Sequence, residues 1–272
     1  MQLDWDNLII LDGCRLDTYR RVITDNPHLD TETLSHRISE GSASLEFLRK
    51  NFGSGNYHDT VYISSNPFTK NIPEGVFHAK HDLINGSDSY WEESVKTVPP
   101  GTMSEAASRI ASEYPRKRII IHFMQPHHPF LGESGEKIEY NRGVYGEREK
   151  KFATDPWHQA YRSFRNDHSL LQDAYRENLE LVLGYIPDLI DRLEGKTVIT
   201  SDHANLIGDR TLPVPVRGYG HPPNVHVAKL LKVPWHEFPG KRRKVVRSAP
   251  PERQDETINN DAERRLEYLG YR

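Results

Sequence analysis

The stretch Thr197–His203, T-V-I-T-S-D-H, decides the fold class because it joins a short buried strand to a polar ending. Val198 and Ile199 are β-branched and apolar, and a Glu-Gly-Lys break precedes the stretch, a pattern typical of a strand. In an open α/β sheet, ligands bind just beyond the carboxyl ends of the strands. Asp202 and His203 stand at that point, where a carboxylate and an imidazole can coordinate a divalent metal ion. The alternative is that Asp202 caps a following helix.

Three further apolar runs also end in polar side chains, and they alternate with segments of helical periodicity. The runs are N-L-I-I-L-D at Asn7–Asp12, T-V-Y-I-S-S-N at Thr60–Asn66 and R-I-I-I-H-F-M-Q-P at Arg118–Pro126. The helical segments are Leu16–Ile23, Thr102–Tyr114 with a capping box from Thr102 to Glu105, and Leu170–Leu193 with a kink or a new helix at Pro187. This alternation predicts an α/β sandwich of three layers, with a mostly parallel central sheet and helices on both faces.

Candidate ligands follow several of these strands. Asp12 ends the first run, and His127 and His128 follow the fourth between two prolines, which hold them in a rigid, extended turn. The carboxyl ends of parallel strands lie on one edge of a sheet, so these residues can converge with the Asp-His pair. The alternatives are an ordinary helix cap for Asp12 and a surface turn for the two histidines.

Two serines and a late histidine complete the candidate set. Ser42 and Ser44 lie in a turn of small residues before a helical face formed by Leu45, Leu48 and Phe52. A hydroxyl at a helix N-terminus lies where backbone N–H groups and the helix dipole favour negative charge, although a plain cap is the alternative. His221 is fixed between a glycine and two prolines, and His226 follows five residues later.

Composition and charge exclude several classes of protein. The chain has 272 residues, 36% hydrophobic and 28% charged, with a net charge of −3, which does not favour bulk binding to nucleic acid. Cys14 is the one cysteine, so no internal disulfide can form. The N-terminus does not resemble a signal peptide, and no apolar window is long enough for a membrane span. A cytoplasmic enzyme is therefore expected.

Residues 1–240 are expected to form one catalytic domain, and residues 241–272 a polar C-terminal extension. Within the extension, the basic run 241–244 is expected to be a solvated face, with binding of an anionic partner as the alternative. A mobile linker is expected over 250–261, followed by a short helix over 262–271. The polar and aromatic stretch Leu131–Phe164 is expected to be a lid or specificity loop, and Phe68–Pro100 a loop with short elements.

In their order along the chain, these segments resemble the alkaline phosphatase and sulfatase superfamily, in particular its small archaeal sulfatase-like members. L-I-I-L-D-G-C-R-L-D-T-Y resembles the family's opening strand, G-S-A-S-L-E-F-L its nucleophile segment and H-F-M-Q-P-H-H-P-F its substrate-binding loop. V-I-T-S-D-H is similar to its metal pair, G-Y-G-H-P-P-N-V-H to its late histidine segment, and E-R-R-L-E-Y-L-G-Y to its C-terminal ending. The ordered set runs from about residue 7 to 272 and implies an alkaline phosphatase-like fold.

The resemblance also implies roles for the candidate residues. Asp12, Asp202 and His203 would hold a divalent cation, Mn, Mg, Ca or Zn, with one ion per site. Ser42 would be the nucleophile because its offset from Glu46 resembles the family's spacing, and Ser44 is its rival. His127 would contact a phosphoryl oxygen, with His128 as a substitute. His221 would bind the ester or complete a second metal site, with His226 nearby.

The implied activity is that of a metal-dependent hydrolase or transferase acting on phosphoric esters through a serine. True sulfatases carry a C/S-x-P-x-R motif, whereas this chain has S-A-S-L-E at Ser42–Glu46, so a phosphoric ester is favoured over a sulfuric ester. The expected partner is a small-molecule, glycan-linked or lipid-linked ester. A sulfatase and a degenerate metal-binding member without activity are the alternatives, and the sequence indicates no particular oligomeric state.

Overall fold

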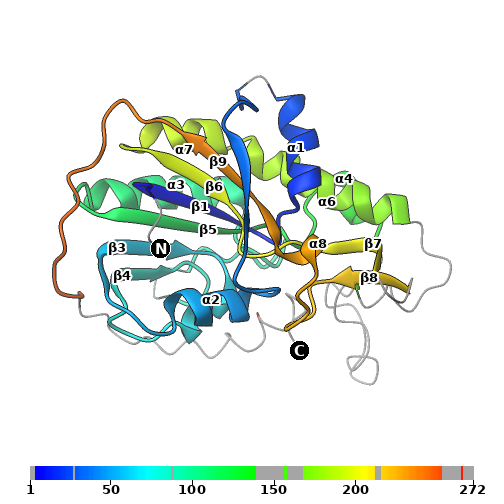
Figure 1. Cartoon of the computed structure of the whole chain (residues 1–272), viewed down its shortest axis with the longest axis horizontal. Helices are drawn as coiled ribbons and strands as arrows, with labels where there is room; N and C mark the ends of the chain where they lie inside the picture. The colour runs from blue at the N-terminus through cyan, green and yellow to red at the C-terminus, as the bar shows by residue number, and fades with distance from the viewer. Residues whose placement is uncertain are drawn as a thin grey trace.

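A sheet of seven strands organises the chain, in the order β2-β9-β6-β1-β5-β3-β4 (Figure 1). This computed structural model describes residues 4–26, 28–86, 89–138, 156–157, 168–211, 216–252 and 265. The strands of the sheet are β1 (Asn7–Asp12), β2 (Leu34–Ile38), β3 (Tyr57–Ser64), β4 (Phe77–Asp82), β5 (Arg118–Pro126), β6 (Thr197–Thr200) and β9 (Lys232–Phe238). Neighbouring strands from β6 to β4 pair in parallel, whereas β9 is antiparallel to both β6 and β2. A separate hairpin is formed by β7 (Leu206–Thr211) and β8 (Val216–Gly220).

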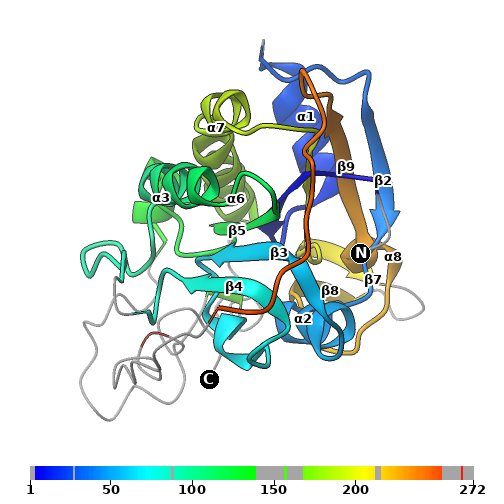
Figure 2. The same cartoon turned by 90° about the vertical axis from the view of Figure 1, so that its left-hand side faces the viewer.

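Helices cover both faces of the sheet, which gives the three layers that the alternating pattern predicts (Figures 1 and 2). The helices are α1 (Leu16–Thr24), α2 (Ser44–Phe52), η1 (Pro67–Asn71), α3 (Pro100–Glu113), α4 (Glu133–Glu136), α6 (His168–Leu183), α7 (Ile186–Arg192) and α8 (Ala228–Leu231). One face is covered by α1, α3, α6 and α7, and the other by α2 and η1. The predicted α/β class and the mostly parallel sheet are therefore confirmed.

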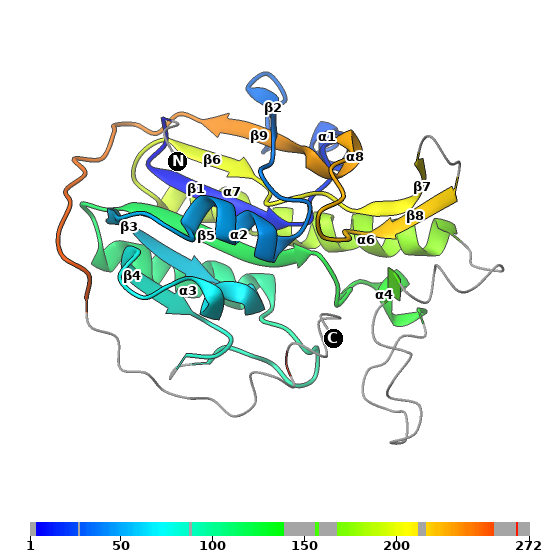
Figure 3. The same cartoon turned by 60° about the horizontal axis from the view of Figure 1, so that its bottom comes forward.

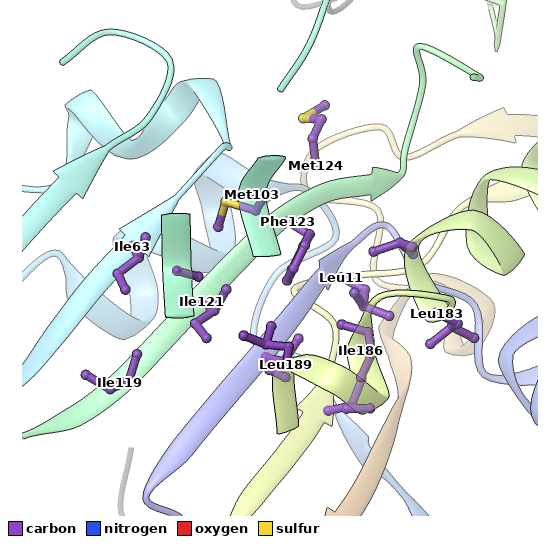
Figure 4. Close-up of a cluster of buried hydrophobic side chains, with 14 of the residues drawn as sticks. Leu11, Ile63, Met103, Ile119, Ile121, Phe123, Met124, Leu183, Ile186 and Leu189 are labelled. Atoms are coloured by element: carbon purple, nitrogen blue, oxygen red, sulfur yellow. The ribbon is translucent and has the colours of Figure 1, made fainter. Parts of the chain in front are cut away.

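The two faces of β1 explain why its sequence is continuously apolar. Ile9 and Leu11 contribute to the core under α3, α6 and α7, part of which Figure 4 shows, whereas Leu8 and Ile10 pack on the side of α2. A strand buried on both faces carries no polar alternation, so it appears as an unbroken hydrophobic run. Such a run leaves the first polar residue, Asp12, to mark the end of the strand.

The strands that the sequence did not predict have mixed or polar patterns. The edge strand β2 reads L-S-H-R-I and is mostly exposed, and β4 reads F-H-A-K-H-D and is half-buried. β4 lies within the stretch Phe68–Pro100, so the prediction of a loop with short elements was incomplete there. In β9, Pro234 interrupts the run, yet the strand pairs on both sides. Their pairing partners, rather than their own periodicity, place these strands in the sheet.

One predicted helix start is wrong, and the alternative role of Asp202 as a helix cap does not hold. α3 begins at Pro100, where a proline needs no N–H partner, so Thr102 and Glu105 lie inside the helix and the predicted capping box is absent. No helix follows Asp202, because the described chain continues through a short turn into β7. Asp202 is therefore not a helix cap. Pro187, by contrast, does separate two helices, since it lies in the first turn of α7.

The basic run near the C-terminus is only partly the solvated face that we expected. Lys244 Nζ donates to Asn7 Oδ1 at 2.8 Å and to the Lys117 carbonyl oxygen at 3.2 Å, and Arg243 pairs with Asp6. Beyond it, the segment to residue 252 runs along the amino ends of the strands (Figure 2). The predicted linker beyond residue 252, the predicted C-terminal helix apart from Arg265, and most of Leu131–Phe164 lie outside the described residues.

Among the described helices, none combines the length and the hydrophobicity that crossing a lipid bilayer would require. A cytoplasmic location stays a prediction of the sequence.

Candidate active site

The candidate site lies at the carboxyl edge of the sheet, where α2 lies across β1 and β5 (Figure 3). Asp12 is the last residue of β1, Asp202 and His203 are the second and third residues after β6, and His127 follows β5. Because β1 lies between β5 and β6, these endings are neighbours. Ser44 is the first residue of α2, so a helix N-terminus joins three strand ends at one place.

Asp12, Asp202 and His203 form a cluster able to hold a metal ion. One ligand atom from each lies within 4.8 Å of the others, and all three residues are buried. His203 Nε2 lies 3.6 Å from Asp12 Oδ1 and 3.4 Å from Asp202 Oδ2. Neither of these two buried carboxylate oxygens has a hydrogen-bond partner within the part of the chain that the structure describes. Two oxygens and one nitrogen facing a common point are a donor set that fits a divalent cation.

The backbone fixes Asp202 and His203 in this orientation. Asp202 Oδ1 accepts hydrogen bonds from the N–H of Gly13 at 3.0 Å and of His203 at 2.9 Å, which leaves Oδ2 facing the cluster. Gly13 has φ +66°, and a Cβ there would lie 2.5 Å from Asn205 Nδ2, so the turn requires glycine. His203 Nδ1 lies 3.0 Å from the carbonyl oxygen of Ala204, which can only accept. The ring proton is therefore on Nδ1, and Nε2 presents a lone pair to the cluster.

Ser44 lies inside this cluster. Its Oγ is 3.1 Å from His203 Nε2 and 3.3 Å from Asp12 Oδ2. Asn66 donates to the same Asp12 oxygen at 2.6 Å and so fixes the carboxylate against β3. The N-cap of α2 is Ala43, whose side chain makes no capping hydrogen bond, so the hydroxyl of Ser44 is not used as a cap.

Ser42 faces a different part of the molecule. Its Oγ lies 3.0 Å from Glu46 Oε2 and 3.1 Å from the carbonyl oxygen of Pro222, and it accepts from the N–H of Val225 at 3.2 Å. The structure thus places Ser44, and not Ser42, in contact with the predicted metal ligands. This geometry favours Ser44, which the sequence ranked second to Ser42, as the candidate nucleophile.

Burial and the neighbouring acid govern the charge of Asp12. Desolvation first, and the negative charge of Asp202 second, raise the pKa of Asp12 well above its ordinary value. Two carboxylates this close and this deeply buried cannot both ionise at low cost, so without a cation the pair holds a proton. A divalent cation would replace that proton and balance both charges, which is a further reason why these residues fit a metal ion.

Three of the predicted histidines, His127, His128 and His221, pack together beside this cluster. The His221 ring is tilted over His203, with centroids 4.3 Å apart, and its Nε2 lies 2.9 Å from His127 Nε2. His127 Nδ1 lies 2.8 Å from the carbonyl oxygen of His128, so the proton of a neutral His127 is on Nδ1 and His221 donates to Nε2. Burial and the neighbouring imidazoles hold the pKa of His127 and of His221 well below the ordinary range. His128 is buried and tilted against His127, with centroids 4.2 Å apart.

His226 lies apart from these rings. It is about half exposed and pairs with Glu46 at 2.7 Å.

Two residues at the site were not singled out from the sequence. Asn66 holds Asp12, and the polar ending of Thr60–Asn66 was the signal that could have found it. His122 is fully buried in β5, with Nδ1 2.7 Å from the Tyr62 hydroxyl and Nε2 3.8 Å from Asp202 Oδ2. Burial lowers its pKa to about 4, so it is neutral near pH 7. A single histidine inside an otherwise apolar strand was the signal that could have found it.

No protein-family model matches the sequence, and no curated protein matches it by sequence. Solved structures do match its fold. The integral membrane lipooligosaccharide phosphoethanolamine transferase A (EptA) of Neisseria meningitidis is similar with a TM-score of 0.54 and 12% identity. The match covers 86% of this chain and 47% of that one, so this chain spans about half its length.

Two further structures share the fold. The C-terminal periplasmic domain of EptC from Escherichia coli, solved in complex with zinc, matches with a TM-score of 0.50 and 12% identity over 86% of this chain and 72% of that one. BT1596, a 2-O GAG sulfatase, matches with a TM-score of 0.53 and 10% identity over 90% and 65% respectively. These matches place the chain in the fold that phosphoethanolamine transferases and a sulfatase share, which agrees with the predicted fold class.

Proposed function

We propose that the chain is a metal-dependent hydrolase or transferase of phosphoric esters in which Ser44 is the nucleophile. The observation that supports this most strongly is the position of Ser44 Oγ, at 3.1 Å from His203 Nε2 and 3.3 Å from Asp12 Oδ2. A nucleophile needs a group beside it that accepts its proton or stabilises its alkoxide. The proposal therefore reverses the order of the two serines and assigns no reaction at the hydroxyl of Ser42.

Asp12, Asp202 and His203 would hold the divalent cation. When bound, the cation would lower the pKa of a coordinated hydroxyl and offset the negative charge of the ester. The described residues contribute the rest. Ser44 stands at the N-terminus of α2, where the helix dipole favours an alkoxide and a phosphoryl group.

The two facing histidines would orient the ester. His221 Nε2–H is a buried donor beside the cluster, and a phosphoryl oxygen entering there would take the place of His127 Nε2 as its acceptor. His127 Nε2, which accepts in the neutral ring, would receive a proton and, once protonated, would donate to a second oxygen. Both rings are neutral near pH 7, so they can donate and accept without an added charge. General acid–base groups of this kind contribute about 10²–10⁴-fold in rate.

The lack of a C/S-x-P-x-R motif at Ser42–Glu46 favours a phosphoric ester over a sulfuric ester. The organic part of the ester would be a small molecule, a glycan or a lipid. A catalytic domain over residues 1–240 contains every residue of the proposed site.

The test is hydrolysis of aryl phosphate monoesters, aryl phosphate diesters and aryl sulfates by the purified protein with Mn²⁺, Mg²⁺, Ca²⁺ or Zn²⁺ and with a chelator. We expect a phosphoric ester to be cleaved in a metal-dependent way. Ser44→Ala should reduce kcat at least about a thousand-fold, and Ser112→Ala, a matched change on the exposed side of α3, should not. Preference for the sulfate would establish a sulfatase, and metal binding without turnover would establish a non-catalytic protein.

A further inference from the structure

The hydroxyl of Ser42 joins two segments that are far apart in the sequence. One is the start of α2, where Ser42 precedes the helix by two residues. The other is the turn Pro222–His226, which offers the carbonyl oxygen of Pro222 at 3.1 Å and the N–H of Val225 at 3.2 Å. Ser42 is fully buried between them. A buried hydroxyl that accepts from one backbone group and faces another fixes the separation of the two segments.

Glu46 extends this contact along the first turn of α2. Its Oε2 accepts from the N–H of Ser42 at 2.9 Å and from the N–H of Asn224 at 3.4 Å. Its Oε1 accepts from His226 Nε2 at 2.7 Å and from Lys50 Nζ at 2.7 Å. Partial burial opposes ionisation, but these donors together hold the pKa of Glu46 well below its ordinary value. The carboxylate is therefore charged across the working pH range and binds the helix start and the turn at once.

The turn matters because of the residue that precedes it. His221 stands next to Pro222, with its ring over His203 and its Nε2 against His127. Ser44 stands two residues after Ser42, in contact with the same His203. The contacts of Ser42 and Glu46 thus connect the backbone beside the serine to the backbone beside the histidine.

We propose that Ser42 and Glu46 form a latch that positions His221 relative to Ser44. Both are positioning residues, and neither touches the ester or the metal ligands. This inference rests on the proposed function, because it assigns the latch to the geometry of that reaction. It also gives Ser42 a role other than the nucleophile for which the sequence favoured it.

The latch predicts a defined set of effects for Ser42→Ala. The N–H of Val225 loses its acceptor, so its hydrogen exchange should become faster. Displacement of a catalytic group by about 1 Å can cost on the order of 10²-fold in rate, and we expect kcat to decrease by about ten- to a hundred-fold. The dissociation constant of the metal should not change, because Asp12, Asp202 and His203 keep their own partners.

The experiment measures Val225 amide exchange by NMR, metal affinity by calorimetry, and kcat on the best phosphoric ester. It compares the wild type with Ser42→Ala, Glu46→Ala, Ser44→Ala and the control Ser112→Ala. Ser42→Ala is also combined with His221→Ala. If Ser42 acts through His221, the second substitution should remove little further rate from a protein that already lacks the histidine. Glu46→Ala should reproduce the faster exchange at Val225.

Three results would overturn the latch. Ser42→Ala with unchanged exchange at Val225 and with the kcat of Ser112→Ala would show that the contact has no effect. Ser42→Ala as inactive as Ser44→Ala, with unchanged exchange, would place Ser42 in the reaction itself. If Ser42→Ala lowers kcat by the same factor in the His221→Ala protein as in the wild type, Ser42 does not act through His221. If the wild type cleaves no ester, the proposed function fails, and exchange at Val225 in Ser42→Ala and Glu46→Ala still decides whether the latch exists.

Discussion

The central sheet has an amino edge, where its parallel strands begin, and a carboxyl edge, where they end. Buried acid is paired at the amino edge, whereas two buried carboxylate oxygens at the carboxyl edge are left unpaired among the described residues. At the amino edge, Asp6 accepts from Arg243 Nε at 2.5 Å and from the N–H of Lys196 at 2.8 Å, and Lys244 donates to Asn7 at 2.8 Å. At the carboxyl edge, Asp12 Oδ1 and Asp202 Oδ2 are buried without a hydrogen-bond partner among the described residues. Both edges belong to the same strands, so the difference does not come from the fold.

The comparison shows where the protein stabilises its own charges and where it leaves them to a ligand. Burying an unpaired carboxylate costs free energy, and a sequence retains such a group where function requires it. The charged pairs at the amino edge stabilise the folded chain without any further partner. The acids at the carboxyl edge should instead destabilise the metal-free protein and stabilise the metal-bound one.

The largest effect should be on metal affinity at the carboxyl edge. Asp202→Ala removes one of the three clustered ligands, and we expect the dissociation constant of Zn²⁺ or Mn²⁺ to rise at least about a hundred-fold. Asp6→Ala, at the amino edge, should leave it unchanged. Competition with a chromophoric chelator measures both values. Equal losses of affinity would show that the two edges do not differ in this way.

The next effect is on the free energy of unfolding of the metal-free protein, which two conservative substitutions should change in opposite directions. In metal-free protein, Asp12→Asn removes an acid whose ionisation is opposed by burial and by Asp202, so the cost of burying that acid is lost and the free energy of unfolding should rise by about 1 kcal/mol. Asp6→Asn weakens the contacts with Arg243 and Lys196 and should lower it by about 1 kcal/mol. Urea denaturation with a chelator present measures both. Destabilisation by both substitutions would contradict the comparison.

The pH dependence of metal-free stability should follow Asp12. Its folded-state pKa is raised well above 3.8, so the folded chain holds the proton more tightly than the unfolded chain does. The contribution of Asp12 is therefore most favourable below pH 3.8 and is lost as the pH rises through the folded-state pKa. Metal binding should strengthen over the same rise, with release of a proton. Titration calorimetry in buffers of different ionisation enthalpy measures that proton, and metal binding without proton release would argue against the shared proton.

The smallest expected effect is on the pH dependence of stability, and it comes from Lys244 at the amino edge. Burial lowers the pKa of Lys244 from 10.5 to about 8, so between these values the unfolded chain holds a proton that the folded chain has lost. Stability should therefore rise with pH across that window by about 1 kcal/mol or less. Lys244→Gln should remove the rise. Denaturation curves at several pH values for both proteins test this, and an identical slope in the variant would contradict it.

The sequence predicted the strands that are buried on both faces better than the strands that are placed by pairing. β1 and β5 have the predicted bounds, since strands buried on both faces are unbroken apolar runs. β2 and β9 were missed because their place depends on pairing with each other and with β6, which periodicity does not encode. The α3 capping box was wrong because a proline two residues earlier starts the helix.

The site shows the same division. The convergence of Asp12, Asp202 and His203 could be predicted because each lies at or just after the end of a recognisable strand, and parallel strands end on one edge. The choice between Ser42 and Ser44 depends on the direction of two side chains in one short turn, and spacing from Glu46 cannot determine it. The spacing did reflect a real contact, since Glu46 binds Ser42. That contact, however, joins the helix to the Pro222–His226 turn and not to the metal cluster.

The central claim is that Asp12, Ser44, Asp202 and His203 share one cation at the carboxyl edge. Anomalous diffraction from crystals grown with Zn²⁺ or Mn²⁺ tests it most directly. We expect one strong anomalous peak within bonding distance of both carboxylates, of His203 Nε2 and of the Ser44 hydroxyl. A peak bound at the amino edge or beside Ser42 and Glu46, with none at Asp12 and Asp202, would contradict it.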